Sequence, residues 1–279
     1  MVPTAGIGFK PCYFDEATAS PAAGLWFEVH PENYMVDGGP RLAMLRALRE
    51  ARPVSFHGVG LSLAGADEPD RAHLARLKRL VEDFRPMFVS EHLAWSRQGE
   101  ICFPDLLPFP RTLESFVRIA RNIEIVQRTL GRQILIENPS LYVTLDGHEL
   151  SETDFLRRLV KRTGCRLLID VNNVAVSANN LGFDAFSYLD ALPHDAIGEI
   201  HLAGHKPDPV HGDVLLIDSH DAPVCETVWA LYEHLLSRTG PIPTLIERDG
   251  NLPSFEALMA ERDRAAAIMR TPRKVAACA

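Results

Sequence analysis

Short runs of apolar residues recur along the chain, and segments with helical periodicity lie between most of them. The runs are rich in Val, Ile, Leu and Phe, which is typical of strands buried on both faces. They cover residues 7–9, 25–29, 54–56, 88–90, 134–136, 167–169, 197–200 and 244–246. Strands that alternate with helices indicate a parallel sheet covered by helices, and eight such strands can close a barrel. The pattern therefore predicts an α/β fold, the TIM (β/α)8 barrel.

Four of the intervening helices have recognisable ends. Apolar residues spaced three or four apart, followed by a terminating Gly or Pro, define two of them, and Ser151 is a candidate N-cap for a third. We expect the fourth to begin at Asp221 and Pro223, because an acidic residue and a proline favour the first turn of a helix. The predicted helices cover residues 70–84, 112–130, 151–164 and 221–240.

The length and composition fit a single domain. The chain has 279 residues, of which 46% are hydrophobic and 24% charged, as in an ordinary globular protein with a large core. We expect one catalytic barrel domain over residues 1–270 and a flexible tail over residues 271–279, where no capped element is recognisable. Residues 101–110 and 203–222 are long for connections in such a barrel, and long loops after barrel strands are where binding and catalysis concentrate.

The charge and the cysteines narrow the class of protein. A formal net charge of −8 repels a phosphate backbone, so no nucleic-acid partner is expected. The chain begins without a basic and apolar leader and has no apolar run of roughly 18 residues, so we expect a cytoplasmic protein that does not enter a membrane. The five cysteines are scattered and never form a Cys-x-x-Cys pair, which argues against both a disulfide framework and a thiolate zinc site.

Polar side chains that can bind metals follow most of the predicted strands. Because the carboxyl ends of all strands share one face of a parallel barrel, we expect these side chains to lie close together. Carboxylates that crowd into a partly dry space repel one another unless cations lie between them. The candidates at the strand ends are His57, Glu91, His92, Glu137, Asn138, Asp170, Asn172, Asn173, His201, His205, Glu247 and Asp249.

The types of these side chains indicate which metals the site could hold. A single His or Glu after a strand usually forms only local hydrogen bonds, but repetition at successive strand ends favours a metal site. Imidazole and carboxylate without thiolate suit non-haem iron, manganese or zinc, and the number of candidates suggests two or three ions. Asp218 and His220 lie two residues apart in the second long loop, where an extended backbone would point both the same way. A local capping role for Asp218 is an equal alternative.

Several motifs in a fixed order resemble one enzyme family. They are GIGF, FEVHPENY, FHGVGLSL, VSEHLAW, LIENPS, DVNNV, EIHLAGH, LLIDSHDAPV and LIERDGNLP, and they extend from Gly6 to Pro253. In this order they resemble the multinuclear non-haem iron-dependent peptide-modifying oxidases typified by the B component of methanobactin biosynthesis. This family was long known only as a domain of unknown function.

The resemblance implies a barrel of the xylose-isomerase type that holds two or three iron ions. It implies an oxidoreductase that uses dioxygen to oxidise cysteine residues of a ribosomally synthesised precursor peptide. Members of the family form an oxazolone with an adjacent thioamide, form a thiooxazole, or excise a carbon from a C-terminal cysteine. The resemblance also implies a separate partner protein that helps to present the peptide.

The same resemblance assigns roles to individual residues. Glu137 is expected to bridge two metals, and Asn173, Asp218 and His220 to contribute to a further, weaker site. Asn33, Asn138 and His205 are candidate substrate-binding residues. Glu28, His30 and Glu32 of the FEVHPENY motif could also reach the strand ends, but alternation along the strand lets only some of them do so, and they are not assigned as ligands. The expected core ligands and catalytic residues are His57, His92, Glu137, Asp170, His201 and Glu247.

Two alternatives stay open at the level of the sequence. A divalent-metal barrel enzyme, such as a sugar isomerase or a phosphodiesterase of the endonuclease type, would place the same residue types at its strand ends. Full activity with zinc, manganese or magnesium alone would favour that class. A non-catalytic metal-binding module would bind iron tightly without consuming oxygen.

Overall fold

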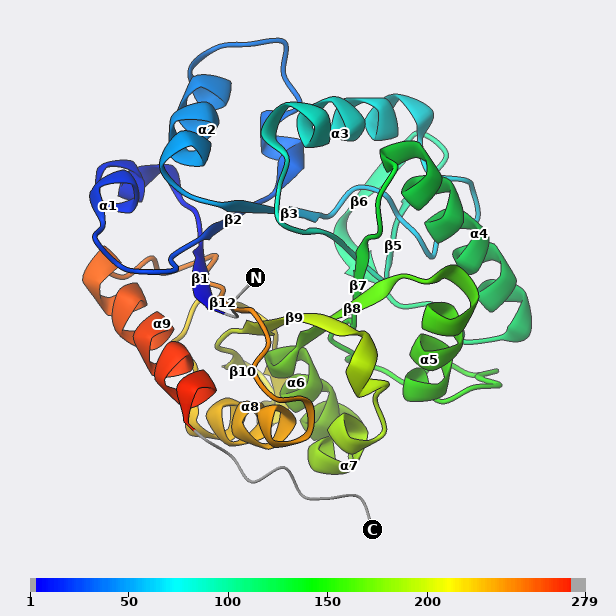
Figure 1. Ribbon diagram of the computed structural model, residues 1–279. Coiled ribbons are helices and arrows are strands. Elements are labelled where there is room, and N and C mark those ends of the chain that lie inside the picture. The colour runs from blue at the N-terminus through cyan, green and yellow to red at the C-terminus, as the bar shows by residue number, and fades with distance from the viewer. Residues whose placement is uncertain (1–3, 272–279) are drawn as a thin grey trace. The chain divides into compact units, whose positions relative to one another are not determined.

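Eight parallel strands close into a barrel in the computed structural model, which describes residues 4–271 (Figure 1). Around the barrel the strands follow the order β1-β12-β9-β8-β7-β4-β3-β2. Each apolar run predicted to be a strand overlaps one of them, which confirms the TIM-barrel prediction. The strands are β1 Ala5–Gly8, β2 Phe27–Val29, β3 Val54–Gly58, β4 Val89–His92, β7 Leu135–Glu137, β8 Arg166–Asp170, β9 Ile197–Leu202 and β12 Thr244–Ile246.

Helices lie between the strands along the chain. Three predicted helices, now α3, α4 and α5, are confirmed to within one residue at each end. The prediction that a helix begins at Asp221 is wrong: α8 begins at Glu226, because the Asp221 carboxylate instead accepts hydrogen bonds from Lys206 and Ser219. The helices are α1 Phe14–Ala19, α2 Pro40–Ala51, α3 Arg71–Phe84, α4 Leu113–Leu130, α5 Glu152–Thr163, α6 Val171–Leu181, α7 Ala185–Asp190, α8 Glu226–Thr239 and α9 Phe255–Arg270, with short 3-10 helices at Pro11–Tyr13, Pro31–Tyr34 and His194–Ala196.

The two segments interpreted as long loops contain antiparallel strands: residues 101–110 supply one strand of a hairpin, and residues 203–222 contain both strands of another. The first pairs β5 Trp95–Gln98 with β6 Ile101–Leu107, and the second pairs β10 Lys206–Asp208 with β11 Gly212–Ile217. Gly99 and Gly212 adopt positive φ angles of 56° and 60° at the turns, a conformation that costs glycine little. In the sequence, these two glycines are the only residues that indicate the hairpins, because the pattern of apolar residues does not predict the exposed hairpin strands.

The described chain divides into two compact units. Unit 1 contains residues 4–8, 140–144 and 167–271, and unit 2 contains residues 9–139 and 145–166. Strands β1, β9 and β12, and β8 from Leu167 onward, belong to unit 1, and strands β2, β3, β4 and β7 belong to unit 2. The expectation of one domain over residues 1–270 stays a prediction, and the expected flexible tail lies, apart from Thr271, outside the described residues.

In unit 2, helix packing decides which side chains of β3 face the helices. Helix α3 begins after Asp70, whose carboxylate accepts a hydrogen bond from the backbone N–H of His73 at 2.6 Å. Its buried stripe ends at Phe84, whose ring lies 6.2 Å from that of Phe56 in β3. Because successive strand residues point to opposite faces, Phe56 on the helix side places His57 on the other side. Figure 1 shows α3, α4 and α5 following one another along this unit.

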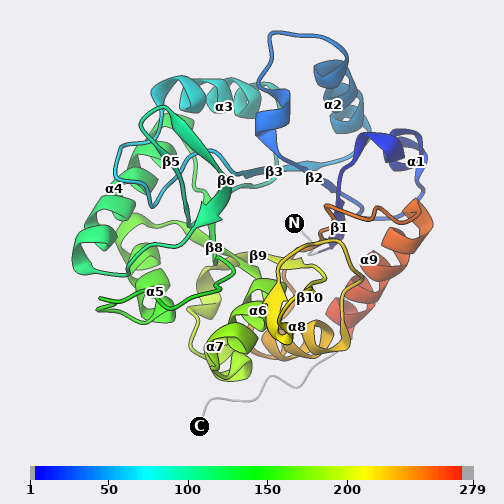
Figure 2. The same ribbon diagram turned by 180° about the vertical axis from the view of Figure 1, so that it is seen from behind.

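In unit 1, the β10–β11 hairpin is attached to α6. The side chain of Asn180 accepts a hydrogen bond from the Leu216 N–H at 2.8 Å and donates one to the Leu216 carbonyl at 3.0 Å, as a neighbouring strand would. Strand β11 contacts α6, and Figure 2 shows the hairpin in the same region of unit 1 as α6 and α8. Helix α6 itself begins directly after β8, with Asp170 as the N-cap that accepts from the Asn173 N–H at 2.7 Å.

Gly204, which follows β9, has no room for a side chain. A Cβ there would lie 2.1 Å from the carbonyl oxygen of Ala222, so Gly204→Ala must push residue 222 and its loop away. We expect the free energy of unfolding to fall by about 1–3 kcal/mol, measured by urea unfolding. Gly8→Ala is the control, since its Cβ would lie 4.0 Å from the Ile246 carbonyl oxygen. Equal stability of the two variants would contradict this account.

Candidate metal centre

Each expected core ligand lies at the carboxyl end of a barrel strand. Glu137 stands opposite His92 in the register of β4 and β7, and Asp170 stands opposite His201 in the register of β8 and β9, so each pair shares a level of the sheet. His92, Glu137 and Asp170 are the last residues of their strands. The other three, His57 in β3, His201 in β9 and Glu247 just after β12, lie within one residue of a strand end.

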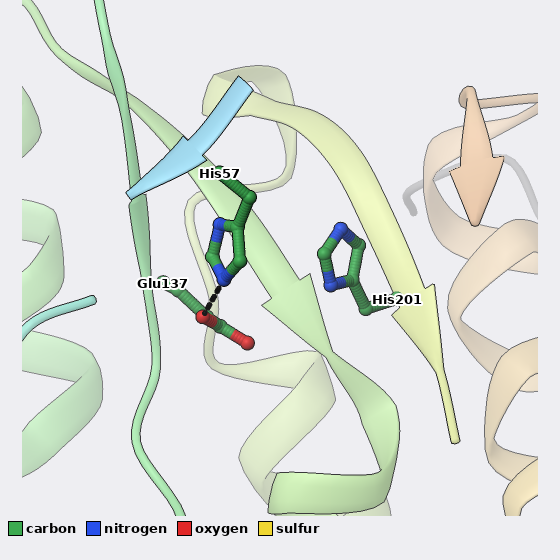
Figure 3. Close-up of side chains that lie close together, drawn as sticks. All are labelled: His57, Glu137 and His201. Carbon is green, nitrogen blue, oxygen red and sulfur yellow. Dashed lines mark ion pairs between the residues drawn. The ribbon is translucent and has the colours of Figure 1, made fainter. Parts of the chain in front are cut away.

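In unit 2, three of these side chains form what we call the imidazole-rich cluster: His57, His92 and Glu137. The Oε2 atom of Glu137 lies 3.1 Å from Nε2 of His57 and 3.0 Å from Nε2 of His92. The two Nε2 atoms are themselves 3.2 Å apart. Figure 3 shows the His57 ring facing the Glu137 carboxylate, with the ion pair dashed; it also labels His201, which extends from β9 in unit 1. Three potential ligand atoms thus meet at nearly equal separations.

Hydrogen bonds on the far side of each ring orient both imidazoles. Nδ1 of His92 lies 2.9 Å from the Gly58 carbonyl oxygen, which can only accept, so this nitrogen carries a proton, and in the neutral ring Nε2 keeps its lone pair. Nδ1 of His57 lies 2.8 Å from the Ser90 hydroxyl, which is 3.4 Å from the Phe56 carbonyl and donates to it. Metal-binding histidines usually hold their second nitrogen in this way.

The spacing of the three atoms fits a metal ion. Ligands bound at about 2.1–2.2 Å on adjacent corners of an octahedron lie about 3.0 Å apart, close to the separations in the imidazole-rich cluster. His57 and Glu137 are buried and His92 is nearly buried. Water can therefore do little to screen the repulsion between the three ligand atoms that face one another. The donor set and the geometry therefore suit a cation at this position.

The pKa values of His92 and Glu137 also indicate that a cation belongs between them. Burial opposes a charge on His92, yet the adjacent Glu137 carboxylate raises the pKa of His92 to about 10. Burial likewise opposes ionisation of Glu137, but the imidazoles of His92 and His57 hold the pKa of that carboxyl far below its usual range. The carboxylate thus stays ionised and demands a positive charge beside it, from either a proton or a metal.

Glu91 does not join the cluster, although it also follows an apolar run. It alternates with His92 along β4, and its carboxylate accepts hydrogen bonds from the N–H groups of Leu61 and His92, both at 3.2 Å. Burial, together with the nearby charge of Glu32, raises the pKa of Glu91 to about 8. Its hydrogen bond from Leu61 holds the β3–α3 loop, and Glu91 binds no metal in our assignment.

In unit 1, a second group, the carboxylate-rich cluster, consists of Asp170, His201, Asp218, His220 and Glu247. Ligand atoms of Asp170, His220 and Glu247 lie within 4.8 Å of one another. Oε2 of Glu247 is 3.1 Å from Nδ1 of His201, and Oδ1 of Asp218 is 2.7 Å from Nε2 of His220. The structure thus brings together two imidazoles and three carboxylates, a mixture that binds divalent or trivalent ions.

His220 reaches this cluster from a strained backbone. Its φ angle is +48°, unusual for a residue other than glycine, and its carbonyl oxygen accepts from the N–H groups of Asp249 at 2.8 Å and Gly250 at 3.3 Å. Burial opposes a charge on the imidazole, but the carboxylates of Glu247 and Asp218 raise the pKa of His220 well above its usual value. The loop conformation, and not strand geometry, therefore places this ligand.

The remaining predicted residues fall into two groups. Asn173 is buried in the first turn of α6, and His205 lies 2.7 Å from the side-chain oxygen of Asn172, which bonds Asp218 in turn. Burial lowers the pKa of His205, which favours its neutral form. The other two candidate substrate-binding residues differ in exposure: Asn138 is buried directly after Glu137, whereas Asn33 is exposed on the 3-10 helix Pro31–Tyr34.

One buried acid escaped the sequence prediction. Glu199 lies in β9, fully buried, with Oε1 3.8 Å from Nε2 of His201. Its position two residues before His201 is a usable signal, since residues two apart on a strand share a face. The apolar neighbours of Glu199 hid it within a run that was interpreted only as a strand.

Comparison with known proteins identifies relatives over nearly the whole chain. A family model described as "RiPP precursor modification enzyme MbnB/TglH/ChrH" matches residues 4–270; RiPPs are ribosomally synthesised, post-translationally modified peptides. A UPF0276 protein of Caulobacter sp. (strain K31) is 63% identical over 265 residues, covering 95% of this chain and 96% of the relative. A UPF0276 protein of Paraburkholderia phytofirmans is 47% identical over 257 residues, covering 92% of this chain and 84% of the relative.

Solved structures with the same fold are sugar epimerases and a nuclease. A D-psicose 3-epimerase from Clostridium cellulolyticum matches with a TM-score of 0.62 and 10% identity, covering 96% of this chain and 98% of that one. Endonuclease IV from Thermus thermophilus matches with a TM-score of 0.59 and 18% identity, with the same coverage of both chains. At this identity the likeness shows the fold, which is the predicted barrel of the xylose-isomerase type.

Among residues 4–271, no helix combines the length and apolar character needed to cross a membrane.

Metal binding to the imidazole-rich cluster should release a proton. Because the pKa of His92 is about 10, the His92–Glu137 pair holds a proton at neutral pH that an incoming ion must displace. We expect about one proton released per ion bound at this cluster at pH 7. Calorimetry in buffers of different ionisation enthalpy measures this number. His92→Ala should remove the release, and His234→Ala, a surface histidine on α8 paired with Asp190, should not; release unchanged in His92→Ala would refute the assignment.

The same raised pKa affects the metal-free protein. A protonated His92 stabilises the fold, and this contribution is complete below the ordinary pKa of 6.5 and disappears as the pH rises through about 10. Unfolding of the metal-free protein should therefore become easier across this window, which urea unfolding at a series of pH values measures. In His92→Ala the loss of stability between these pH values should be smaller.

Ser90 should matter for metal affinity although it binds no metal. Ser90→Ala removes the acceptor that fixes the proton on Nδ1 of His57, so Nε2 no longer keeps its lone pair reliably. We expect the affinity for metal to fall about 10- to 100-fold, measured by chelator competition. Ser55→Ala is the matched control, because the buried Ser55 hydroxyl has no hydrogen-bond partner in the described part of the chain. Equal affinities of the two variants would overturn this role.

Proposed function

Because the chain belongs to the RiPP precursor modification enzyme MbnB/TglH/ChrH family, we propose that it is a multinuclear iron oxidase that uses dioxygen to modify cysteine residues of a ribosomally synthesised precursor peptide. In this proposal the barrel is one catalytic domain over residues 1–270, and the two clusters described above hold two or three iron ions. The products expected are of the oxazolone and thioamide or thiooxazole type.

The observation that carries the choice of iron is the donor set of the imidazole-rich cluster. Two histidines and one carboxylate on adjacent corners of an octahedron are typical of non-haem ferrous oxygenases, which keep the other corners open for substrates. His57, His92 and Glu137 have this composition and the matching separations of 3.0–3.2 Å. The site contains no thiolate, which disfavours copper(I) and iron–sulfur clusters.

Further ions would bind the carboxylate-rich cluster. Its three carboxylates supply negative charge that balances di- or trivalent ions, and His201 and His220 supply neutral donors. Asn173 is proposed to add a weak oxygen ligand. Glu137 is the proposed bridging ligand. Both imidazoles of the imidazole-rich cluster contact its Oε2 atom, and its Oε1 atom is the second oxygen donor that a carboxylate needs to bind two metals.

Bound iron would supply the redox chemistry with dioxygen that oxidises the cysteine of the peptide. The protein's own residues hold the ligands in place, and the buried surroundings of His57 and Glu137 exclude bulk water from the reacting groups. His205 is neutral at physiological pH, so it can orient a peptide amide without adding charge. Asn33 and Asn138 are the other proposed contacts of the peptide. A separate partner protein that presents the peptide is part of the proposal.

Activity should depend on iron, oxygen and Glu137 together. We expect the protein, loaded anaerobically with Fe(II) and mixed with a cysteine-containing precursor peptide and the partner protein, to change the mass of the peptide only after oxygen is added. Glu137→Gln removes the charge shared by both imidazoles and should lower kcat/KM at least about 100-fold, as loss of a metal ligand or its support does. Mass spectrometry of the peptide and an oxygen electrode provide the measurements.

Controls separate this function from its alternatives. Glu114→Gln changes an exposed glutamate of α4 and should leave the rate unchanged. Full activity of a zinc, manganese or magnesium form on a sugar or a phosphodiester would instead support the isomerase or phosphodiesterase alternative. Tight iron binding without oxygen consumption, for every candidate peptide, would support a module that only binds metal.

A further inference from the structure

Tyr142 lies beside the loop that carries Asp218 and His220, and no role has been assigned to it so far. It belongs to unit 1, in the segment after β7, and its hydroxyl oxygen accepts a hydrogen bond from the backbone N–H of Asp218 at 3.0 Å. The segment is anchored on α6: the Leu141 N–H donates to the Ser177 hydroxyl at 2.9 Å. Helix α6 therefore supports the Tyr142 phenol independently of the loop it contacts.

The position of Asp218 matters because its side chain makes two contacts in the carboxylate-rich cluster. Its Oδ1 atom lies 2.7 Å from Nε2 of His220 and accepts from the side-chain amide of Asn172 at 2.8 Å. A shift of the Asp218 backbone would carry Oδ1 away from both partners. We call residues 218–220 the Asp218–His220 arm.

The arm is held at both ends in a conformation that costs energy. At its far end, the carbonyl oxygen of His220 accepts from the Asp249 N–H at 2.8 Å, and His220 itself keeps a φ angle of +48°. Strained backbone persists only where the surroundings fix it from more than one side. At its near end, the hydrogen bond to Tyr142 supplies that restraint.

We propose that Tyr142 is a positioning residue that sets the geometry of the Asp218–His220 arm and thereby the affinity of the metal bound there. The proposal rests on the metal centre of the proposed function. Tyr142 is 39% exposed, so removing its hydroxyl costs little packing. Its effect is therefore exerted through the hydroxyl, and a variant that keeps the ring isolates that effect.

The test uses the full-length, metal-free protein titrated anaerobically with Fe(II) alone, in competition with a chromophoric chelator. Tyr142→Phe removes the acceptor and keeps the ring, His220→Ala removes the metal ligand of the arm, and Val143→Ala changes an exposed neighbour. We expect His220→Ala to lose the most weakly bound iron and Tyr142→Phe to bind that iron about tenfold more weakly. Val143→Ala should bind as the wild type does, and Tm of metal-free Tyr142→Phe should equal that of the wild type.

Two results would overturn the positioning role while leaving the metal centre standing. One is a Tyr142→Phe titration that superimposes on the wild type while His220→Ala is weakened. The other is a Tyr142→Phe protein with a lowered Tm and equally weakened binding of every iron, which is the behaviour of a structural residue. If His220→Ala itself titrates like the wild type, the arm holds no metal, and the assignment of the arm and the role of Tyr142 are both wrong.

Discussion

The site depends on one constraint: three ligand atoms, 3.0–3.2 Å apart, face one another among buried side chains at the strand ends. The Gly58 carbonyl and the Ser90 hydroxyl occupy the outer nitrogens of two imidazoles, so the inner nitrogens face the Glu137 carboxylate and can take either a proton or a metal ion. Such an arrangement is costly unless a cation completes it. The surrounding strands and helices supply the packing energy that keeps these groups together when the cation is absent.

The two clusters differ in what holds them. Strand register fixes the imidazole-rich cluster, since His92 and Glu137 are direct neighbours across β4 and β7. The carboxylate-rich cluster combines strand-end residues with a loop whose backbone at His220 is strained. In the proposed function, the strand-held cluster would bind its ion rigidly and the loop-held cluster would adjust when the peptide binds, because loops move at lower cost than strands.

The sequence predicted the parts of the fold that follow from periodicity, and it missed parts that lack an apolar pattern. Short apolar runs indicated all eight barrel strands, because strands buried on both faces are apolar at nearly every position, and the polar residues that follow most of these runs indicated the candidate site. The hairpins were missed, since their exposed strands carry no such pattern and only Gly99 and Gly212 mark the turns. Glu199 was missed for the opposite reason, because apolar neighbours enclose it.

Distances within the site depend on tertiary contacts, which the sequence does not specify. The direction of the Glu91 side chain follows from the alternation of residues along β4, and the position of His220 follows from a left-handed backbone that no local motif predicts.

The attachment of the β10–β11 hairpin to α6 has an evolutionary consequence. The side chain of Asn180 forms hydrogen bonds with the backbone N–H and carbonyl of Leu216, and the side chain of Asn179 donates to the backbone carbonyl of Asp213. Both contacts are made to backbone atoms of the hairpin and do not depend on its side chains. Residues such as Val210 and Val214, which are 82% and 81% exposed, can therefore be substituted without loss of these contacts. Related proteins can therefore diversify the outer surface of this hairpin while the same chain segment continues to hold the candidate metal ligands Asp218 and His220 in place.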